Sequence, residues 1–240
     1  MHDPLHQFEV HRLFSFSLGG VDLSFTNSAL YMVLGVLLAA VFLLGGVRRA
    51  QTIPGRWQGG VEMIYDYLST VLEGTTGFKG RPYFPFIMTL FLFVLMGNLL
   101  GMVPYSFTFT SQIIVTFGLA MMAFGLCTLI GFWKHGFHYF SLFVPQGAPI
   151  YMLPLIVPIE ILSYLSRPVS LAIRLFANMM AGHTMLKVFA GFTVTLGIYG
   201  LAPLCVNTIL TAFEILVALL QAYVFTILTC IYLRDALYLH

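Results

Sequence analysis

The chain has 240 residues, of which 59% are hydrophobic and only 8% are charged. A typical soluble domain carries about 25% charged residues, so this composition excludes a water-soluble surface and predicts that most of the surface faces lipid. The net charge of +2 and the lack of a basic run exclude nucleic acid as a partner.

Three hydrophobic runs are long enough to cross a bilayer, which takes about 20 apolar residues in a helix. The polar segment 1–27 lacks the apolar core of a signal peptide, so the run 28–47 predicts a retained first span. Two further runs, 83–104 and 111–133, predict a helical hairpin over 83–133.

The segment 54–76 is amphipathic instead, because apolar side chains at helical spacing occupy one face and acids the other. The apolar face consists of Trp57, Val61, Ile64, Leu68 and Val71, and the acids are Glu62, Asp66 and Glu73. This pattern predicts a helix that lies in the membrane interface. An amphipathic helix packed on the protein is the alternative.

Two longer runs, 149–196 and 202–233, follow. As one helix the first would extend about 70 Å, more than twice the thickness of the bilayer core. Either it is itself a hairpin, broken or kinked at its prolines, or it is one steeply tilted helix. We favour tilt, because the second run is also longer than one crossing requires. The two then form a tilted hairpin over 149–233 with its tip near Tyr199.

Basic residues predict the orientation. They gather in two hinges that should share a side, the cytoplasm or matrix, and they are Arg48, Arg49, Arg56, Lys79, Arg81 and Lys134. The hinge YSFTFT between the second and third spans has no charge, so it is expected on the outer side together with the N-terminal segment. Altogether we expect one membrane domain over 1–240, an all-α integral membrane protein of about five to six helices.

Ionisable groups inside a membrane are costly and mark functional sites. A first polar stripe, within about 40° on the helix, consists of Glu160, Arg167, Arg174 and Asn178. A second, within about 80° on the last helix, consists of Asn207, Thr211, Glu214 and Gln221. In an antiparallel hairpin with its tip near residue 198, Arg174 should lie level with Gln221, and His183 with Glu214.

Most of these residues also have plain structural interpretations. Arg167 and Lys187 could extend towards lipid headgroups. His183 could be a buried structural histidine, Glu160 could be solvated, and Asn98 and Gln221 could join helices. Arg174 is harder to explain in this way, because the nearest acid on its helix, Glu160, is fourteen residues away. A permanently charged guanidinium without a local partner predicts a partner on another chain.

Other chemistry has little support in the sequence. Cys127, Cys205 and Cys230 lie in apolar stretches without metal-ligand spacing, so we expect buried thiols. HGFH, residues 135–138, is a weak metal signal, and no nucleotide or metalloprotease motif is present. We therefore expect no cofactor, no metal and no enzymatic activity in this chain.

At these residues the sequence resembles subunit a of the F-type ATP synthases, over essentially the whole chain. The motif SRPVSLAIRLFANMMAGH, residues 166–183, carries the resemblance most specifically, with the family's essential arginine at Arg174 and its amide at Asn178. Glu214 and Gln221 match the second functional helix, and GNLLGMVP, residues 97–104, matches the outer channel and makes Asn98 a candidate lining residue. Some bacterial members have the acid and the histidine exchanged relative to His183 and Glu214.

The resemblance implies a stationary, non-catalytic proton-channel subunit that abuts a ring of c subunits, each with one membrane carboxylate. It also implies two half-channels separated by Arg174, a relay through His183 and Glu214, release near Glu160, and b-type peripheral-stalk subunits among the partners in the F1Fo complex. The N-terminus looks alphaproteobacterial, which indicates a bacterial inner membrane, with the mitochondrial inner membrane as the alternative. A secondary transporter and a proton-pumping respiratory subunit are the rival functions.

Overall fold

The computed structural model describes residues 10–14, 17–18, 21–22, 24–48, 51–103, 106–144 and 150–238. Five helical segments in that part of the chain are long and apolar enough to cross a membrane, which confirms the expected all-α integral membrane protein. Of the expected outer segment 1–27, residues 1–9 and several later positions lie outside the described residues, as does Arg49 of the basic hinge.

Short strands precede the first helix. Two antiparallel pairs form, β1 (Arg12–Phe14) with β4 (Phe25–Thr26) and β2 (Ser17–Leu18) with β3 (Val21–Asp22). Helix α1 (Asn27–Val47) begins directly after β4, where the hydroxyl of Thr26 accepts a hydrogen bond from the N–H of Ala29 and caps the helix.

Helix α2 (Arg56–Thr76) packs its apolar face on the protein. Val61, Leu68 and Leu72 are buried, and α2 contacts α1, α3 and α6. At the crossing with α1 a Cβ on Gly46 would lie 2.6 Å from Cγ2 of Val61, so only glycine allows the two helices to come this close. The amphipathic face predicted from the sequence is therefore, in this structure, a helix-packing face.

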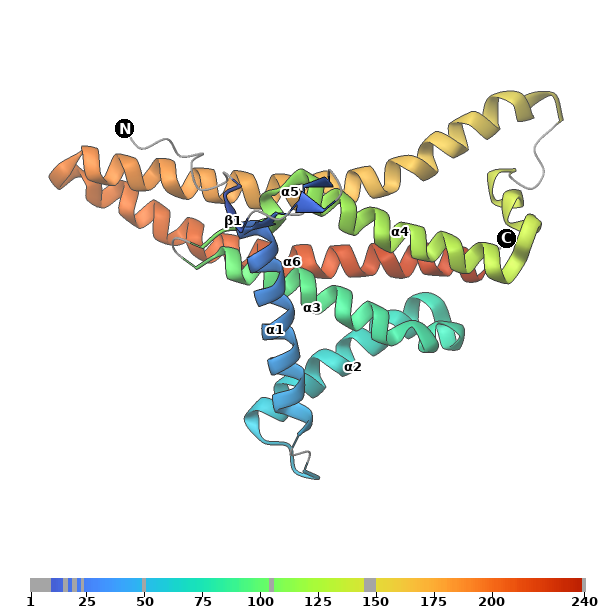
Figure 1. Ribbon diagram of the computed structural model, residues 1–240, viewed down its shortest axis with the longest axis horizontal. Helices are drawn as coiled ribbons and strands as arrows, with labels where there is room; N and C mark the ends of the chain where they lie inside the picture. The colour runs from blue at the N-terminus through green and yellow to red at the C-terminus, as the bar shows by residue number, and fades with distance from the viewer. Residues whose placement is uncertain are drawn as a thin grey trace.

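A run of helical segments follows: η2 (Gly77–Tyr83), α3 (Phe84–Gly101), η3 (Phe109–Ser111), α4 (Ile113–His135) and η4 (Gly136–Phe143). The expected hairpin over 83–133 is not a directly packed pair, because α3 and α4 each pack extensively on α6 instead. In Figure 1 the red helix α6 lies between them.

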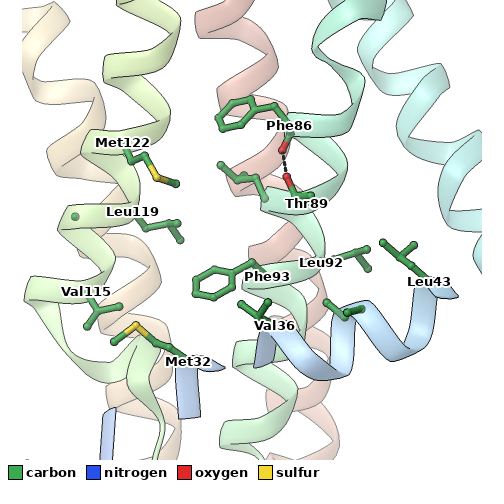
Figure 2. A pocket seen from close by; sticks show the side chains of 14 residues that line it. Met32, Val36, Leu43, Phe86, Thr89, Leu92, Phe93, Val115, Leu119 and Met122 are labelled. Carbon is green, nitrogen blue, oxygen red and sulfur yellow. Dashed lines mark hydrogen bonds between the residues drawn. The ribbon is translucent and has the colours of Figure 1, made fainter. Parts of the chain in front are cut away.

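On another side α1, α3 and α4 surround an apolar cavity of about 570 Å³. Figure 2 shows Val36, Phe93 and Val115 directed into it from the three helices. The hydroxyl of Thr89 in its lining donates to the carbonyl of Phe86. No ionisable side chain lines this cavity, so the polar residues of the sequence analysis belong elsewhere.

The short turn η5 (Ile150–Met152) leads into the longest element, α5 (Leu153–Thr195), which is followed by η6 (Gly197–Gly200) and α6 (Leu201–Leu237). α5 is one helix of 43 residues that runs through Pro158 and Pro168 without a break, so the first long run is not a hairpin in itself. α5 and α6 pack along each other, and their tip projects beyond the other helices at the left of Figure 1. In that view they run across the direction of α1.

Two side-chain contacts show which helix ends lie next to the hinges. The ammonium of Lys79 in η2 lies 4.6 Å from the ring centre of Tyr238, so the basic hinge and the C-terminal end of α6 are neighbours. The rings of Tyr31, at the start of α1, and Phe107, in the uncharged hinge, lie 6.2 Å apart. The Tyr31–Phe107 contact joins segments that are both expected on the outer side.

The core is formed mainly where α6 is covered by α3, α4 and α5, and its buried side chains include Leu171, Leu175, Met179, Ala222 and Phe225. Cys127 and Cys230 are buried there, as expected. Cys205 is exposed, and the expectation of three buried thiols was wrong for it, because the tip-proximal turns of α6 extend past the helices that cover the rest.

Candidate functional site

The hairpin of α5 and α6 brings together most of the polar residues that the sequence analysis selected. Three polar pairs connect the two helices at successive levels: His183 with Glu214, Asn178 with Gln221, and Arg167 with Asp235. Antiparallel packing requires such a ladder, in which one residue number rises as the other falls. The pairs therefore fix the register of the hairpin.

At the level nearest the tip, Nδ1 of His183 lies 3.4 Å from Oε1 of Glu214, as the numbering predicted. Nε2 of the same ring lies 3.1 Å from the hydroxyl of Thr108, in the hinge between α3 and α4. All three side chains are buried. Within the described part of the chain neither carboxylate oxygen of Glu214 has a well-formed hydrogen bond. A buried carboxyl group left in that state is costly, which indicates a functional role.

At the next level Nδ2 of Asn178 donates to Oε1 of Gln221 over 2.8 Å. The numbering had placed Arg174 at the level of Gln221, so the observed partner lies one helical turn closer to the tip. The Nε2 group of Gln221 is buried without a partner among the described residues. It retains the capacity to donate to a water molecule or to a group from another chain.

Asn98 of α3 is fully buried against α6, where its Nδ2 donates to the carbonyl of Ala218 over 3.2 Å. Ala218 lies one turn from Glu214 and almost one turn from Gln221. Asn98 thus joins α3 to the stretch of α6 between Glu214 and Gln221, in agreement with its interpretation as an amide that joins helices. Its Oδ1 is a buried acceptor without a partner in the described chain.

Arg174 occupies an exposed position on α5, although Leu171, Ala172 and Leu175 close to it on the same helix are buried. Its guanidinium makes no hydrogen bond or ion pair with any residue that the structure describes. The absence of a local partner, inferred from the sequence, therefore extends to the tertiary structure. Exposed on the hairpin surface, the charge is available to another molecule.

Arg167 behaves differently. Its Nη1 lies 2.7 Å from Oδ2 of Asp235, and its guanidinium lies 5.5 Å and 6.0 Å from the ring centres of Tyr164 and Tyr232. Beside the interpretation that Arg167 extends towards headgroups, the structure shows an acid near the end of α6 that pairs with this side chain. Sequence spacing along one helix did not reveal this pair, because Asp235 lies on the other long helix, 68 positions away.

The remaining candidates lie at the edges of the site. Glu160 is half-buried on the N-terminal part of α5, well away from the tip. Lys187 is half-buried near the other end of the same helix. In the second stripe the hydroxyl of Thr211 donates to the carbonyl of Asn207, and Oδ1 of Asn207 has no partner in the described residues.

Thr108 is the residue that the sequence analysis missed. It lies in an uncharged hinge, where neither charge nor helical spacing distinguishes it from its neighbours. The only indication in the sequence was the high content of hydroxyl groups in YSFTFT, and such a composition is also typical of an ordinary loop. Its contact with His183 bridges 75 positions along the chain and follows from the fold alone.

Together these features define a multi-pass α-helical membrane protein with a buried acid–histidine pair and, on the same long hairpin, an exposed arginine that has no partner among the described residues. The family model of the ATP synthase A chain matches residues 29–234. The chain is 54% identical to ATP synthase subunit a of Rhodospirillum rubrum, over all of both chains. It is 55% identical to that of Pelagibacter ubique, over 99% of this chain and 98% of the relative, and 51% identical to that of a Chelativorans species, over 98% of each.

The chain belongs to the ATP synthase A chain family, that of the proton-translocating subunit in the membrane sector of F-type ATP synthase. This confirms the family resemblance noted in the sequence. A secondary transporter and a respiratory-complex subunit are thereby set aside. As in the relatives that carry the name, its place is within an F1Fo complex in a membrane.

Proposed function

We propose that this chain is the stationary subunit that provides two offset half-channels to a rotating ring of c subunits, with Arg174 as the barrier between them. The observation that carries the proposal is the exposed guanidinium of Arg174, which has no partner within the described chain. A fixed positive charge in an apolar surface requires an anion, and a membrane carboxylate on a ring subunit would supply it.

The outer half-channel would use His183 and Glu214. The histidine accepts and donates protons near neutral pH, and an adjacent carboxylate can exchange a proton with it. Their separation of 3.4 Å supports direct transfer or transfer through small movements. Glu214 then delivers the proton to the ring carboxylate, whose neutral form can pass into lipid at much lower cost than its charged form.

Arg174 would act on the ring carboxylate that arrives ionised. The guanidinium attracts this carboxylate. It also repels a proton that would otherwise cross directly between the half-channels. This role requires a group that stays protonated, for which arginine is better suited than lysine. The Asn178–Gln221 bond one turn away holds two amide side chains beside this position, and the free Nε2 of Gln221 is suited to orient water or the carboxylate.

The inner half-channel would lead past Glu160, on the part of α5 that is far from the hairpin tip. Its half-buried carboxylate is suited to receive the proton that the next ring subunit releases. The transmembrane potential, about 2.3 kcal/mol per charge per 100 mV, and the pH difference would drive the sequence of steps.

The long helices and α2 also indicate how the subunit would lie in the membrane and beside its partners. The two long helices, 43 and 37 residues, are longer than one perpendicular crossing requires, which supports a steep tilt along the ring. The amphipathic α2 would lie at the membrane boundary with its exposed acids in water. We expect b-type peripheral-stalk subunits as further partners, and a bacterial inner membrane as the location, with the mitochondrial inner membrane as the alternative.

The test is Arg174→Ala in the assembled F1Fo complex. The expected result is loss of proton-driven ATP synthesis with normal amounts of complex, measured as synthesis by energised vesicles and by native gel electrophoresis. Arg48→Ala, an exposed arginine near the end of α1, is the matched control and should leave synthesis intact. Coupled synthesis in the Arg174→Ala complex would overturn the proposed role.

A further inference from the structure

The second part of the hinge between α3 and α4, residues 107–111, is buried. Phe107, Thr108, Phe109, Thr110 and Ser111 all have less than a tenth of their surface exposed. The hydroxyl of Ser111 donates to the carbonyl of Thr108 over 2.6 Å. A segment rich in hydroxyl groups is therefore folded into the protein at the end of the bundle that also holds the start of α1.

Two glycines of α3 allow this hinge to pack so deeply. A Cβ on Gly101 would lie 2.5 Å from Cγ2 of Thr108, and a Cβ on Gly97 would overlap the ring of Phe109. Any larger residue at either position would have to push the hinge outwards. The glycine pair thus places Thr108 against α5 rather than forming a helix–helix contact.

Thr108 contacts His183 on the side of the ring opposite Glu214. Its hydroxyl lies 3.1 Å from Nε2 of His183 and 3.5 Å from the carbonyl oxygen of Gly101. A hydroxyl group both donates and accepts. When the imidazole proton is on Nδ1, the hydroxyl can donate to Nε2. When the proton is on Nε2, the hydroxyl oxygen can accept a hydrogen bond from Nε2–H and donate its own hydrogen to the Gly101 carbonyl.

We propose that Thr108 is a positioning residue for proton transfer, which holds the His183 ring with Nδ1 directed at Glu214 in both neutral tautomers. The inference rests on the proposed relay through His183 and Glu214. Without this hydrogen bond the ring is held less firmly about its side-chain bonds, and Nδ1 then spends less time near the carboxylate. Proton delivery slows, although every group that carries the proton is still present.

The test uses two substitutions that separate the hydroxyl from the methyl group of Thr108. Thr108→Val keeps a branched side chain, which suits the extended backbone at this residue, and removes the hydroxyl. Thr108→Ser keeps the hydroxyl and removes the methyl group that faces Gly101. Proton flux is measured in vesicles that contain the assembled complex, together with the amount of complex. Thr116→Val is the control, because that buried hydroxyl bonds only to backbone carbonyls of its own helix region.

The expected result is a flux about tenfold lower in Thr108→Val, the effect of about one hydrogen bond, and a much smaller loss in Thr108→Ser. A packing role predicts the reverse order, so equal or greater loss in Thr108→Ser would overturn the proposal, as would normal flux in both. If Thr108→Val does not assemble, Thr108→Ala replaces it. Alanine and serine both lack the methyl group of threonine, and only serine has the hydroxyl. Equal flux in these two variants would therefore also overturn the proposal.

His183→Ala in the same assay separates this inference from the proposed function. Normal flux in His183→Ala would overturn the relay itself. Slow flux in His183→Ala together with normal flux in Thr108→Val would overturn only the role of Thr108.

Discussion

Arg167 of α5 forms an ion pair with Asp235 of α6, with Nη1 and Oδ2 2.7 Å apart, whereas Arg174, two turns further along the same face of α5, has no acid within reach in the described chain. Two arginines of one polar stripe therefore have opposite situations. The first is satisfied inside the subunit and helps to fix the hairpin. The second is left for a partner, which is the basis of the proposed function.

The Arg167–Asp235 pair should contribute to hairpin stability rather than to proton transfer. Its partners are partly exposed, so we expect a coupling of only about 1 kcal/mol, supported by the rings of Tyr164 and Tyr232. A double-mutant cycle with Arg167→Ala and Asp235→Ala, read by thermal unfolding of the purified complex, measures it. Additive effects of the two substitutions would show that the ion pair contributes nothing to the stability of the complex.

Exchanging His183 and Glu214 should harm the protein less than losing either residue. The side chains face each other across 3.4 Å, so the double exchange keeps one acid and one imidazole in the same pair. Each single replacement by alanine is expected to slow proton flux about 100-fold, the usual contribution of a positioned proton-transfer group. If the double exchange is no better than the worse single replacement, the two residues do not act as a pair.

Gly182 provides a test of where the Glu214 carboxylate must lie. A Cβ on Gly182 would lie 2.5 Å from Oε1 of Glu214, so Gly182→Ala should displace the carboxylate from His183. Alanine favours a helix by about 1 kcal/mol relative to glycine, so stability should not fall while proton flux does. Gly191→Ala, on the same helix with open space around it, is the control. Equal flux in the two variants would contradict the assignment.

The sequence predicted the parts of this site that depend on helical spacing. Of the first polar stripe, Arg167 and Asn178 do face α6, whereas Arg174 is exposed. The position of the tip gave the His183–Glu214 pair correctly. The same arithmetic placed Gln221 opposite Arg174, one turn away from its actual partner Asn178. The two residue numbers of a pair do not add up to the same value in the three polar pairs. Helices that cross at an angle do not keep the constant register of parallel rods.

The features that escaped the sequence depend on segments without periodicity or on tertiary packing. Thr108 reaches His183 only because the hinge folds back over Gly101. α3 and α4 are neighbours in the chain, yet each packs extensively on α6, because side-chain packing and not chain order decides which helices are in contact. The prolines of α5 suggested a break, but in a membrane helix the hydrogen bonds lost at a proline can be satisfied by surrounding groups.

Glu160→Gln should slow proton release only modestly. Its carboxylate is half-buried, and a partly solvated charge contributes about 1 kcal/mol or less, so we expect less than about a tenfold loss of flux. The measurement is ATP synthesis against the driving force in energised vesicles. Unchanged flux would return Glu160 to the interpretation of an ordinary solvated acid.

The role of Arg174 as a barrier is tested most directly by the distance from its guanidinium to the nearest ring carboxylate in an experimental structure of the assembled F1Fo complex. We expect a ring carboxylate within about 6 Å of Arg174, the range over which opposite charges interact strongly. A guanidinium among lipid headgroups, or paired with an acid of its own subunit, would contradict it.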